Sequence, residues 1–377
     1  MEAALTSPEL PRLNQNKQVS RTQIGPSRRS IRCASRRGFW LKIEELLRAW
    51  KLILSGRRPS LSIEITRECP LRCPGCYAYN ENHLGPSAPL RQLSDFKGEE
   101  LVRRVLQVVD ELKPLHLSIV GGDPLVRYRE LEQLLPELMK RGIHVQLVTS
   151  AFRVLPVEWK RFRKLSLVIS VDGLQPEHDQ RRKPATYDRI FKNIEGHRDT
   201  ISIHCTITAQ MVRRPGYLAE FLDFWAQRPE TKRVWFSMYT PQKGEIANEI
   251  LSREQRAEAV KMLLALRKKK NKLDMRPEAI EAFLTPPQSP EKCAFARTTH
   301  TVSADLKTRV TPCQFGGNPD CSQCGCIASV ALHALTEFRT PVGLKVGTIL
   351  NASLRIGELV QLKGENPPPS APTAAEA

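Results

Sequence analysis

The apolar and polar positions of this chain follow two alternating patterns between about residues 60 and 271. Short apolar runs, typical of buried strands, alternate with segments in which apolar residues recur every three or four positions, typical of helices. The runs predict strands at residues 61–66, 115–120, 145–149, 167–171, 201–208 and 234–239. The recurring segments predict helices at about 95–112, 128–141, 157–164, 187–197, 216–227 and 252–270, the last opening with a capping box at Ser252 and Gln255.

Alternation of strand and helix with short connections is typical of an α/β fold in which helices cover a parallel sheet. Six such units joined by right-handed crossovers predict a partial (β/α)6 barrel, similar to a TIM barrel but open on one side. In such barrels the chemistry lies at the carboxyl ends of the strands. We therefore expect functional residues just after the predicted strands.

The segments outside this core have different compositions. Residues 1–38 contain eight basic and two acidic residues without apolar periodicity, which predicts a disordered basic segment. Residues 39–58 form a predicted amphipathic helix, and the core extends over 59–284. A cysteine-rich unit is expected at 291–350 after a proline-containing break, and the Pro- and Ala-rich residues 364–377 are expected to be a disordered tail.

The chain is strongly basic, with a formal net charge of +18 from 58 basic and 40 acidic residues and a pI of about 9.7. Such a charge favours anionic partners, among them nucleic acid and acidic membrane surfaces. No apolar run is long enough to predict a transmembrane helix, and no secretory signal pattern is present. We therefore expect a cytoplasmic protein, in which clustered cysteines indicate metal ligands rather than disulfides.

Three cysteines, Cys69, Cys73 and Cys76, follow the first predicted strand with the spacing C-x3-C-x2-C, and Tyr77 comes next. Three thiolates suit a [4Fe–4S] cluster with one iron left open for a small molecule. A structural zinc site is the alternative, and it would need a fourth ligand such as His83.

Two further motifs lie at the ends of later strands. Gly121-Gly122-Asp123-Pro124 follows the second strand, where glycines allow a ligand to approach the backbone closely, although an ordinary βα turn has the same composition. The fourth strand ends at Ser170-Val-Asp172-Gly173, and Arg182 follows nine residues later. Considered alone, Asp172 is also a common turn residue and Arg182 a common surface ion-pair residue.

Together these motifs resemble those of the radical S-adenosylmethionine (SAM) superfamily, over roughly residues 60–345. The resemblance implies that Cys69, Cys73 and Cys76 hold a [4Fe–4S] cluster whose open iron binds SAM. Reductive cleavage of SAM would then give a 5′-deoxyadenosyl radical that abstracts hydrogen from substrate. It further implies that Gly121, Gly122 and Asp123 hold the methionine amino group, and that Ser170 and Arg182 contact SAM. The chain departs from the usual pattern at Gly75, commonly aromatic, and at Asp123, commonly Glu.

A second group, Cys293, Cys313, Cys321, Cys324 and Cys326, lies in the C-terminal unit. It resembles a shortened SPASM or twitch extension, which implies one auxiliary [4Fe–4S] cluster. Which four cysteines bind it stays open, and a four-thiolate zinc site is the alternative.

The resemblance thus implies a radical SAM enzyme whose substrate is unknown, with a peptide or protein as the leading substrate class. It also implies a flavodoxin or ferredoxin as the electron donor. The charge leaves an RNA-modifying enzyme as one alternative, and the cysteines leave a zinc-stapled, non-catalytic binding protein as another.

Overall fold

The computed structural model describes residues 44–79, 83–84, 93–184, 187–269 and 272–363. The predicted disordered segments 1–38 and 364–377 lie outside the described residues. Residues 44–54 are helical, which agrees with the helix predicted at 39–58. The first residues of that predicted helix, 39–43, also lie outside the described part. Residues 47–377 group as one unit, and the following description concerns its described part.

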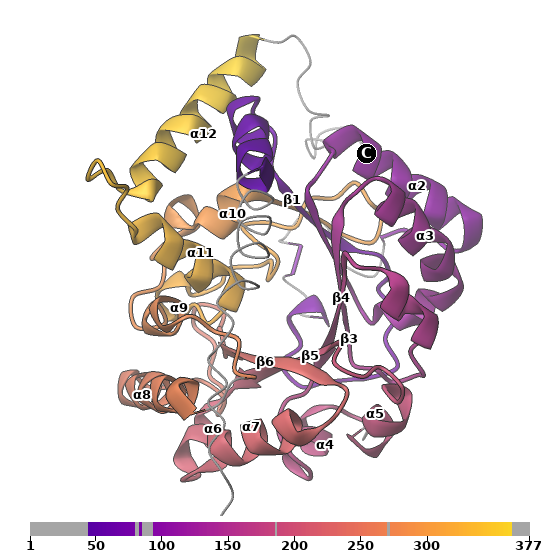
Figure 1. Ribbon diagram of the computed structural model, residues 1–377, viewed down its shortest axis with the longest axis vertical. Helices are drawn as coiled ribbons and strands as arrows, with labels where there is room; N and C mark the ends of the chain where they lie inside the picture. The colour runs from indigo at the N-terminus through magenta and orange to yellow at the C-terminus, as the bar shows by residue number, and fades with distance from the viewer. Residues whose placement is uncertain (1–43, 80–82, 85–92, 185–186, 270–271, 364–377) are drawn as a thin grey trace, which may run out of the picture. The chain divides into compact units, whose positions relative to one another are not determined.

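Seven parallel strands form one sheet in the order β6-β5-β4-β3-β2-β1-β7 (Figure 1). All six predicted strands are present, and each pairs with its neighbour along the chain, which agrees with a partial barrel. The seventh strand was not predicted and pairs with β1 over four residues, from Ser60 opposite Thr299 to Ile63 opposite Val302. The strands are β1 Ser60–Glu64, β2 His116–Val120, β3 His144–Thr149, β4 Leu165–Ser170, β5 Ile201–Ile207, β6 Thr231–Met238 and β7 Thr299–Val302.

The two faces of this sheet differ in polarity, most clearly in β5. In β5, Ile201, Ile203 and Cys205 are buried on the face that packs against the helices, whereas His204 and Thr206 line a central cavity on the concave face. Side chains alternate between the faces because successive residues of a strand point in opposite directions. Parallel strands are usually apolar on both faces. The polar concave face is therefore the first structural indication of a site.

Helices cover the convex face of the sheet, with α2 and α3 packed side by side (Figure 1). The predicted helix at 157–164 is instead the short 3-10 helix η4, Val157–Arg161, in which the Trp159 N–H donates to the Pro156 carbonyl and the Phe162 N–H to the Trp159 carbonyl. The predicted capping box of α8 is present, since Ser252 and Gln255 exchange side-chain-to-backbone hydrogen bonds of 3.0 and 3.2 Å. The core helices are α2 Gly98–Leu112, η3 Pro124–Arg127, α3 Tyr128–Lys140, α4 Glu177–Arg181, α5 Tyr187–Asn193, α6 Ala209–Arg213, α7 Tyr217–Gln227, α8 Arg253–Lys269 and α9 Pro277–Glu281.

The cysteine-rich C-terminal unit packs directly on the barrel. The Met238 N–H at the end of β6 donates to the Gly325 carbonyl at 2.9 Å, and the Gly325 N–H donates to the Thr240 hydroxyl at 2.8 Å. The last helix crosses the expected boundary at residue 350 and contacts the N-terminal helix through a Trp50–Ser353 hydrogen bond of 3.0 Å. This unit contains η5 Pro290–Lys292, α10 Ala294–Thr298, β7, η6 Cys321–Gln323, α11 Ile327–Glu337 and α12 Val346–Lys363.

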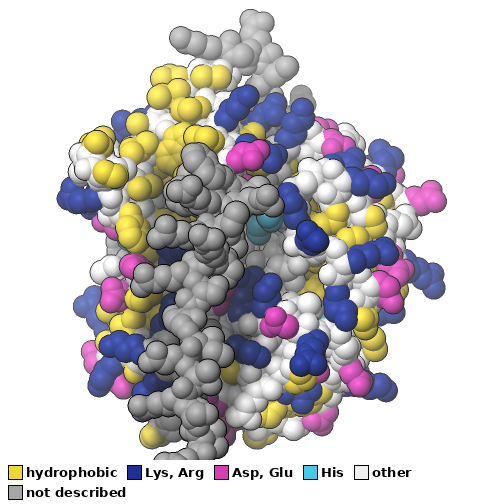
Figure 2. Space-filling view, viewed as in Figure 1, with side chains coloured by type: hydrophobic (Ala, Val, Ile, Leu, Met, Phe, Trp, Pro, Cys, Tyr) yellow, Lys and Arg dark blue, Asp and Glu magenta, His cyan; other side chains and the backbone are white. Residues whose placement is uncertain are grey.

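Exposed apolar side chains gather over α12 and the loop before it (Figure 2). Ile356, Leu359 and Val360 of α12 are exposed, and so is Val342 of the loop. None of the helices in the described ranges combines the length and the apolar content of a membrane span.

Candidate functional site

The concave face of the sheet borders a cavity of about 590 Å³. Strand residues such as Ser118, Gln146 and His204 form its floor, and the segment 73–77 and the first turns of α11 form parts of its wall. Several residues that the sequence singled out meet there although they come from separate segments, among them Cys73, Cys76, Ser170 and Arg182.

The three cysteines of the first group lie on the loop that joins β1 to η1, Tyr77–Tyr79. Burial raises the pKa of Cys69 to about 12 and also raises the pKa of Cys73, where the charge of Arg182 opposes the shift. The ligand that binds here must therefore be positive enough to displace thiol protons, as metal centres are. Three thiols on one loop beside a guanidinium are a donor set that fits an anionic iron–sulfur cluster.

The Gly121–Asp123 turn packs against the residues that precede Cys69. The Gly122 N–H donates to the Thr66 carbonyl at 2.8 Å, and the Asp123 N–H donates to the Glu68 carbonyl at 2.9 Å. A Cβ atom on Gly122 would lie 2.1 Å from the Glu68 oxygen, so only glycine fits there. The turn therefore sets the position of the cysteine loop, but its residues are not among those that line the central cavity.

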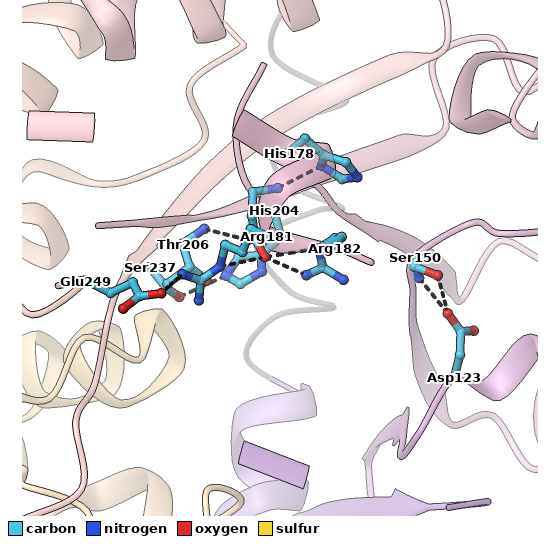
Figure 3. Close-up of polar contacts among 10 residues, drawn as sticks. Asp123, Ser150, His178, Arg181, Arg182, His204, Thr206, Ser237 and Glu249 are labelled. Atoms are coloured by element: carbon cyan, nitrogen blue, oxygen red, sulfur yellow. Dashed lines mark hydrogen bonds and ion pairs between the residues drawn. The ribbon is translucent and has the colours of Figure 1, made fainter. Parts of the chain in front are cut away.

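The Asp123 carboxylate is buried and already accepts four hydrogen bonds. Its donors are the Leu125 N–H at 3.0 Å, the Thr149 hydroxyl at 2.6 Å, and the N–H and hydroxyl of Ser150 at 2.8 and 2.6 Å (Figure 3). These bonds tie the end of β2 to the end of β3. The Asp123 side chain therefore has a positioning role. Any contact of the turn with a methionine amino group would be made by the backbone of the turn.

Asp172, buried after β4, holds two arginines. Its Oδ2 atom accepts from Arg181 Nε at 3.2 Å and from Arg182 Nε at 3.0 Å. Burial would raise the pKa of Asp172, but the charges of Arg182 and Arg181 hold it below its usual range. Burial would lower the pKa of Arg182, but the charges of Asp172, Cys73 and Cys76 raise it. Arg182 is therefore part of a buried ion pair and adjoins the cysteine loop.

Arg181 has other neighbours. Its guanidinium lies 3.5 Å from Glu249 (Figure 3), and it lies 5.6 Å from the centre of the Tyr239 ring. The two neighbouring arginines thus face different parts of the cavity, which their adjacency in sequence did not indicate.

The cavity also has polar residues that were not predicted, among them a hydrogen-bonded pair from β5 and β6. His204 Nε2 of β5 lies 2.8 Å from the hydroxyl of Ser237 in β6, and that hydroxyl also accepts from the Ile327 N–H at 3.3 Å (Figure 3). Burial lowers the pKa of His204 to about 4, so the ring is neutral near pH 7. The alternation of apolar and polar residues in 201–208 was the available signal, because it marks every second residue as facing away from the helices.

The second cysteine group lines a smaller cavity of its own. All five cysteines border it, and the Sγ atom of Cys293 lies 3.1 Å from the Ser329 hydroxyl. Burial raises the pKa of Cys313 to about 12, and the charges of Cys324, Cys293 and Cys321 add to this shift. In the part of the chain that the structure describes, no three His, Cys, Asp or Glu side chains are grouped as ligands of a single metal ion.

Cys326 differs from the other four cysteines because it borders both cavities. The Gln314 amide donates to its Sγ atom at 3.4 Å. Near it, the rings of Tyr77 and Phe315 meet edge to face with centres 5.3 Å apart. Tyr77 follows Cys76, and Phe315 borders both cavities, so this aromatic pair lies between the two cysteine groups.

Comparison with known proteins agrees with this architecture. The model of the radical SAM superfamily matches residues 63–224. Fe-coproporphyrin III synthase of Methanosarcina barkeri (strain Fusaro / DSM 804) is 21% identical over 220 residues, which cover 55% of this chain and 51% of that protein. The chain thus spans about half the length of this curated relative.

Two solved structures share the fold. SuiB of Streptococcus suis, bound to precursor peptide SuiA, matches with a TM-score of 0.52 and 16% identity over 86% of this chain and 76% of SuiB. The enzyme anSMEcpe with bound AdoMet matches with a TM-score of 0.51 and 18% identity over 68% of this chain and 74% of that one. The family match, the parallel barrel and the cysteine loop at its carboxyl edge agree, and residues 63–224 of this chain therefore form a domain of the radical SAM superfamily.

Proposed function

We propose that this protein is a radical SAM enzyme whose reaction takes place in the central cavity. The observation that carries the proposal is the meeting of Cys73 and Cys76 with Ser170 and Arg182 around that cavity. The superfamily uses a [4Fe–4S] cluster and SAM, which together supply a 5′-deoxyadenosyl radical for hydrogen abstraction. Cys69, Cys73 and Cys76 are the proposed ligands of that cluster.

The protein residues around this loop have separate tasks in the proposal. Arg182 balances the negative charge of the thiolates at Cys73 and Cys76 and offers a carboxylate of SAM two parallel donors. Asp172 holds that guanidinium in place, and Ser170 adds a hydroxyl on the cavity wall. The neutral His204 and its partner Ser237 lie where a substrate group can be hydrogen-bonded.

We further propose that Cys293, Cys313, Cys321 and Cys324 hold an auxiliary cluster. The support is that the charges of these cysteines act on one another around one cavity. Burial raises the pKa of Cys321 to about 11, and the charges of Cys324 and Cys293 contribute to this rise. Cys326 is the cysteine left over, because it also borders the central cavity.

For the substrate we propose a peptide or protein. The support is the likeness in fold to SuiB, which was solved with its precursor peptide SuiA, and the share of the chain that this likeness covers. The electron that starts the reaction comes from an external one-electron carrier.

The decisive experiment is anaerobic reconstitution with iron and sulfide, followed by dithionite and SAM. We expect 5′-deoxyadenosine from the natural chain and none from Cys73→Ala. The matched control is Cys205→Ala, a buried cysteine on the convex face of β5, which should keep the activity. Zinc without iron or sulfide in the purified protein, or equal product from both variants, would overturn the proposal.

Iron counting tests the auxiliary site separately. In a chain lacking Cys69, Cys73 and Cys76, we expect the iron that remains to be lost when Cys293, Cys313, Cys321 or Cys324 becomes Ser. Cys326→Ser should keep it. Loss of iron from the Cys326 variant alone would show that the ligand set is different.

A further inference from the structure

The cysteine loop has an inner and an outer side. Cys73, Pro74, Gly75 and Cys76 line the central cavity, where the proposed function places SAM and substrate. Arg72, directly before Cys73, is exposed and is not among the cavity-lining residues. Arg72 therefore lies on a side of the loop that an electron carrier too large to enter the cavity can reach.

A second exposed basic residue lies on this outer side. The backbone N–H of Lys183 donates to the Cys73 thiol, and its carbonyl accepts from the Arg72 N–H at 2.5 Å. Lys183 is exposed and does not line the cavity either. The backbones of Arg72 and Lys183 therefore contact each other beside Cys73, and each carries a positive side chain.

These two side chains have no acidic partner within the described part of the chain. The carboxylates of Glu68, directly before Cys69, and of Asp95, which accepts from the Arg67 N–H, are already paired. Glu68 accepts from Lys97 at 2.6 Å and from Arg127 at 3.1 Å, and Asp95 accepts from Arg127 at 2.9 Å. The outer side of the loop thus carries a local positive surplus that its own acidic residues do not cancel.

The net charge alone would not identify this surface, because Lys and Arg side chains are scattered over the face shown in Figure 2. What distinguishes Arg72 and Lys183 is their attachment to Cys73. Charges at the rim of an interface mainly raise the rate of association and fix the orientation of the partner. A carrier docked on this pair would have its redox centre directed at the cysteine loop.

Resting on the proposed function, we propose that Arg72 and Lys183 are the docking point for an acidic one-electron carrier protein of the flavodoxin or ferredoxin kind. The carrier is oxidised by one electron and the cluster held by the loop is reduced by one, with no bond made or broken. This assigns the outer side of the loop to the electron donor and leaves the cavity side to SAM and substrate.

The test compares two double variants of the reconstituted full chain. Arg72→Glu/Lys183→Glu reverses the proposed docking charges, and Lys268→Glu/Lys269→Glu makes the same change in net charge at the exposed end of α8. A recombinant bacterial flavodoxin is titrated against each protein at low ionic strength. We expect its Kd to rise about tenfold for the first variant and to stay within about twofold for the second.

The salt dependence and the source of electrons provide two further readouts. The difference in Kd should disappear at about 0.5 M salt, where the Debye length falls to a few ångströms. The ratio of flavodoxin-driven to dithionite-driven 5′-deoxyadenosine formation should fall about tenfold in the first variant only.

Equal flavodoxin affinity and an equal ratio in the natural chain and in Arg72→Glu/Lys183→Glu would overturn the docking proposal. An equal loss in both double variants would overturn it too, because only net charge would then matter. Failure of the natural chain to form 5′-deoxyadenosine with dithionite would instead reject the proposed function, and the titration distinguishes the two cases.

Discussion

Individual side chains hold the shape of the candidate site as well as lining it. Asp123 shows this most clearly, because all of its contacts are with the protein itself: the Leu125 N–H, the Thr149 hydroxyl and two groups of Ser150. A buried carboxylate with four donors is stable only while every donor is present. Its role at the residue scale is to keep the ends of β2 and β3 together beside the cysteine loop.

We expect Asp123→Ala to lower the free energy of unfolding by about 3 kcal/mol, because it leaves buried donors of Thr149 and Ser150 without an acceptor. Urea unfolding measures this change. The control is Asp110→Ala, whose carboxylate is exposed and pairs with Arg141 at 2.8 Å, and which should cost less than about 1 kcal/mol. Equal losses at both positions would contradict the positioning role.

His178 makes stability depend on pH. It is fully buried, and its Nδ1 atom accepts the Asp172 N–H at 3.2 Å, which requires a neutral ring on that side. Burial, and then the charge of Arg182, lower the pKa of His178 from 6.5 to about 4. Between these values the unfolded chain binds a proton that the folded chain excludes. Acidification through this window therefore destabilises the fold.

For His178 we expect the free energy of unfolding to fall by at most about 1.4 kcal/mol per pH unit between pH 6.5 and about pH 4. Urea unfolding at several pH values measures the slope. The slope should become shallower in His178→Gln, although His204 and His300, with pKa values lowered to about 4 by burial, still contribute. An unchanged slope would mean that His178 is not the responsible group.

At the scale of elements, the close approach of the β2–η3 turn to the end of β1 positions the cysteine loop. Gly122→Ala would place a Cβ atom 2.1 Å from the Glu68 carbonyl oxygen, and because that oxygen belongs to the backbone, the loop must shift. We expect a severalfold loss of iron bound by Cys69, Cys73 and Cys76, measured by iron and acid-labile sulfide analysis. Gly244→Ala is the control.

Gly244 has a φ of +79°, but no heavy atom lies within 4 Å of the place that a Cβ atom would occupy, so Ala there costs only backbone strain of about 1 kcal/mol. The Gly244 variant should keep its iron. If both variants lose iron alike, general destabilisation rather than loop position is the cause.

A second contact at this scale joins α8 to the C-terminal cysteines. The guanidinium of Arg256 is buried and donates to the carbonyls of Phe283 at 3.3 Å, Gln323 at 2.7 Å and Cys324 at 3.2 Å. It therefore fixes the loop that contains η6 against the barrel.

In the chain lacking Cys69, Cys73 and Cys76, we expect Arg256→Gln to reduce the remaining iron severalfold, because the second cysteine loop loses two charge-assisted hydrogen bonds, those to Gln323 and Cys324. Iron analysis measures the effect. Arg253→Gln, exposed at the first residue of the same helix, should leave it unchanged. Full iron retention in the Arg256 variant would show that this anchor is dispensable.

At the scale of the whole molecule, the C-terminal unit completes the barrel. β7 covers the edge of β1, and α11 walls the cavity near β6. An unpaired parallel edge exposes backbone groups and promotes aggregation. The unit that carries the second cysteine group is therefore also part of the sheet that positions the first.

We expect a chain ending at residue 290 to aggregate or to melt at a lower temperature, because β1 loses β7, its partner on one side, and becomes an edge strand. A chain ending at residue 363, after α12, should keep its Tm within about 2 °C. Size-exclusion chromatography and thermal unfolding followed by circular dichroism measure both. A stable monomer from the shorter chain would mean that the barrel is complete without β7.

Features that depend on neighbours in sequence were predictable. The six longer strands follow from apolar runs, the capping box of α8 from Ser252 and Gln255, and the cysteine loop from the spacing of Cys69, Cys73 and Cys76. These signals act over a few residues, where chain geometry alone determines which side chains can meet.

Features that depend on distant partners were not. Thr299–Val302 has no strong strand pattern and is a strand because the edge of β1 offers it hydrogen bonds. Other contacts likewise join residues far apart in the chain. They are those of Asp123 with Ser150, of His204 with Ser237 and of Arg181 with Glu249.

By itself, then, the amino-acid sequence determined the repeating strand–helix units, the spacing of the two cysteine groups and the edge of the sheet at which the first one lies. Only the tertiary structure decided which polar groups hydrogen-bond within the protein to hold the turn at Gly121–Asp123, and which ones face the cavity. The reason is that local periodicity is set by covalent geometry, whereas a side chain's partners are set by the packing of strands that the chain brings together from a distance.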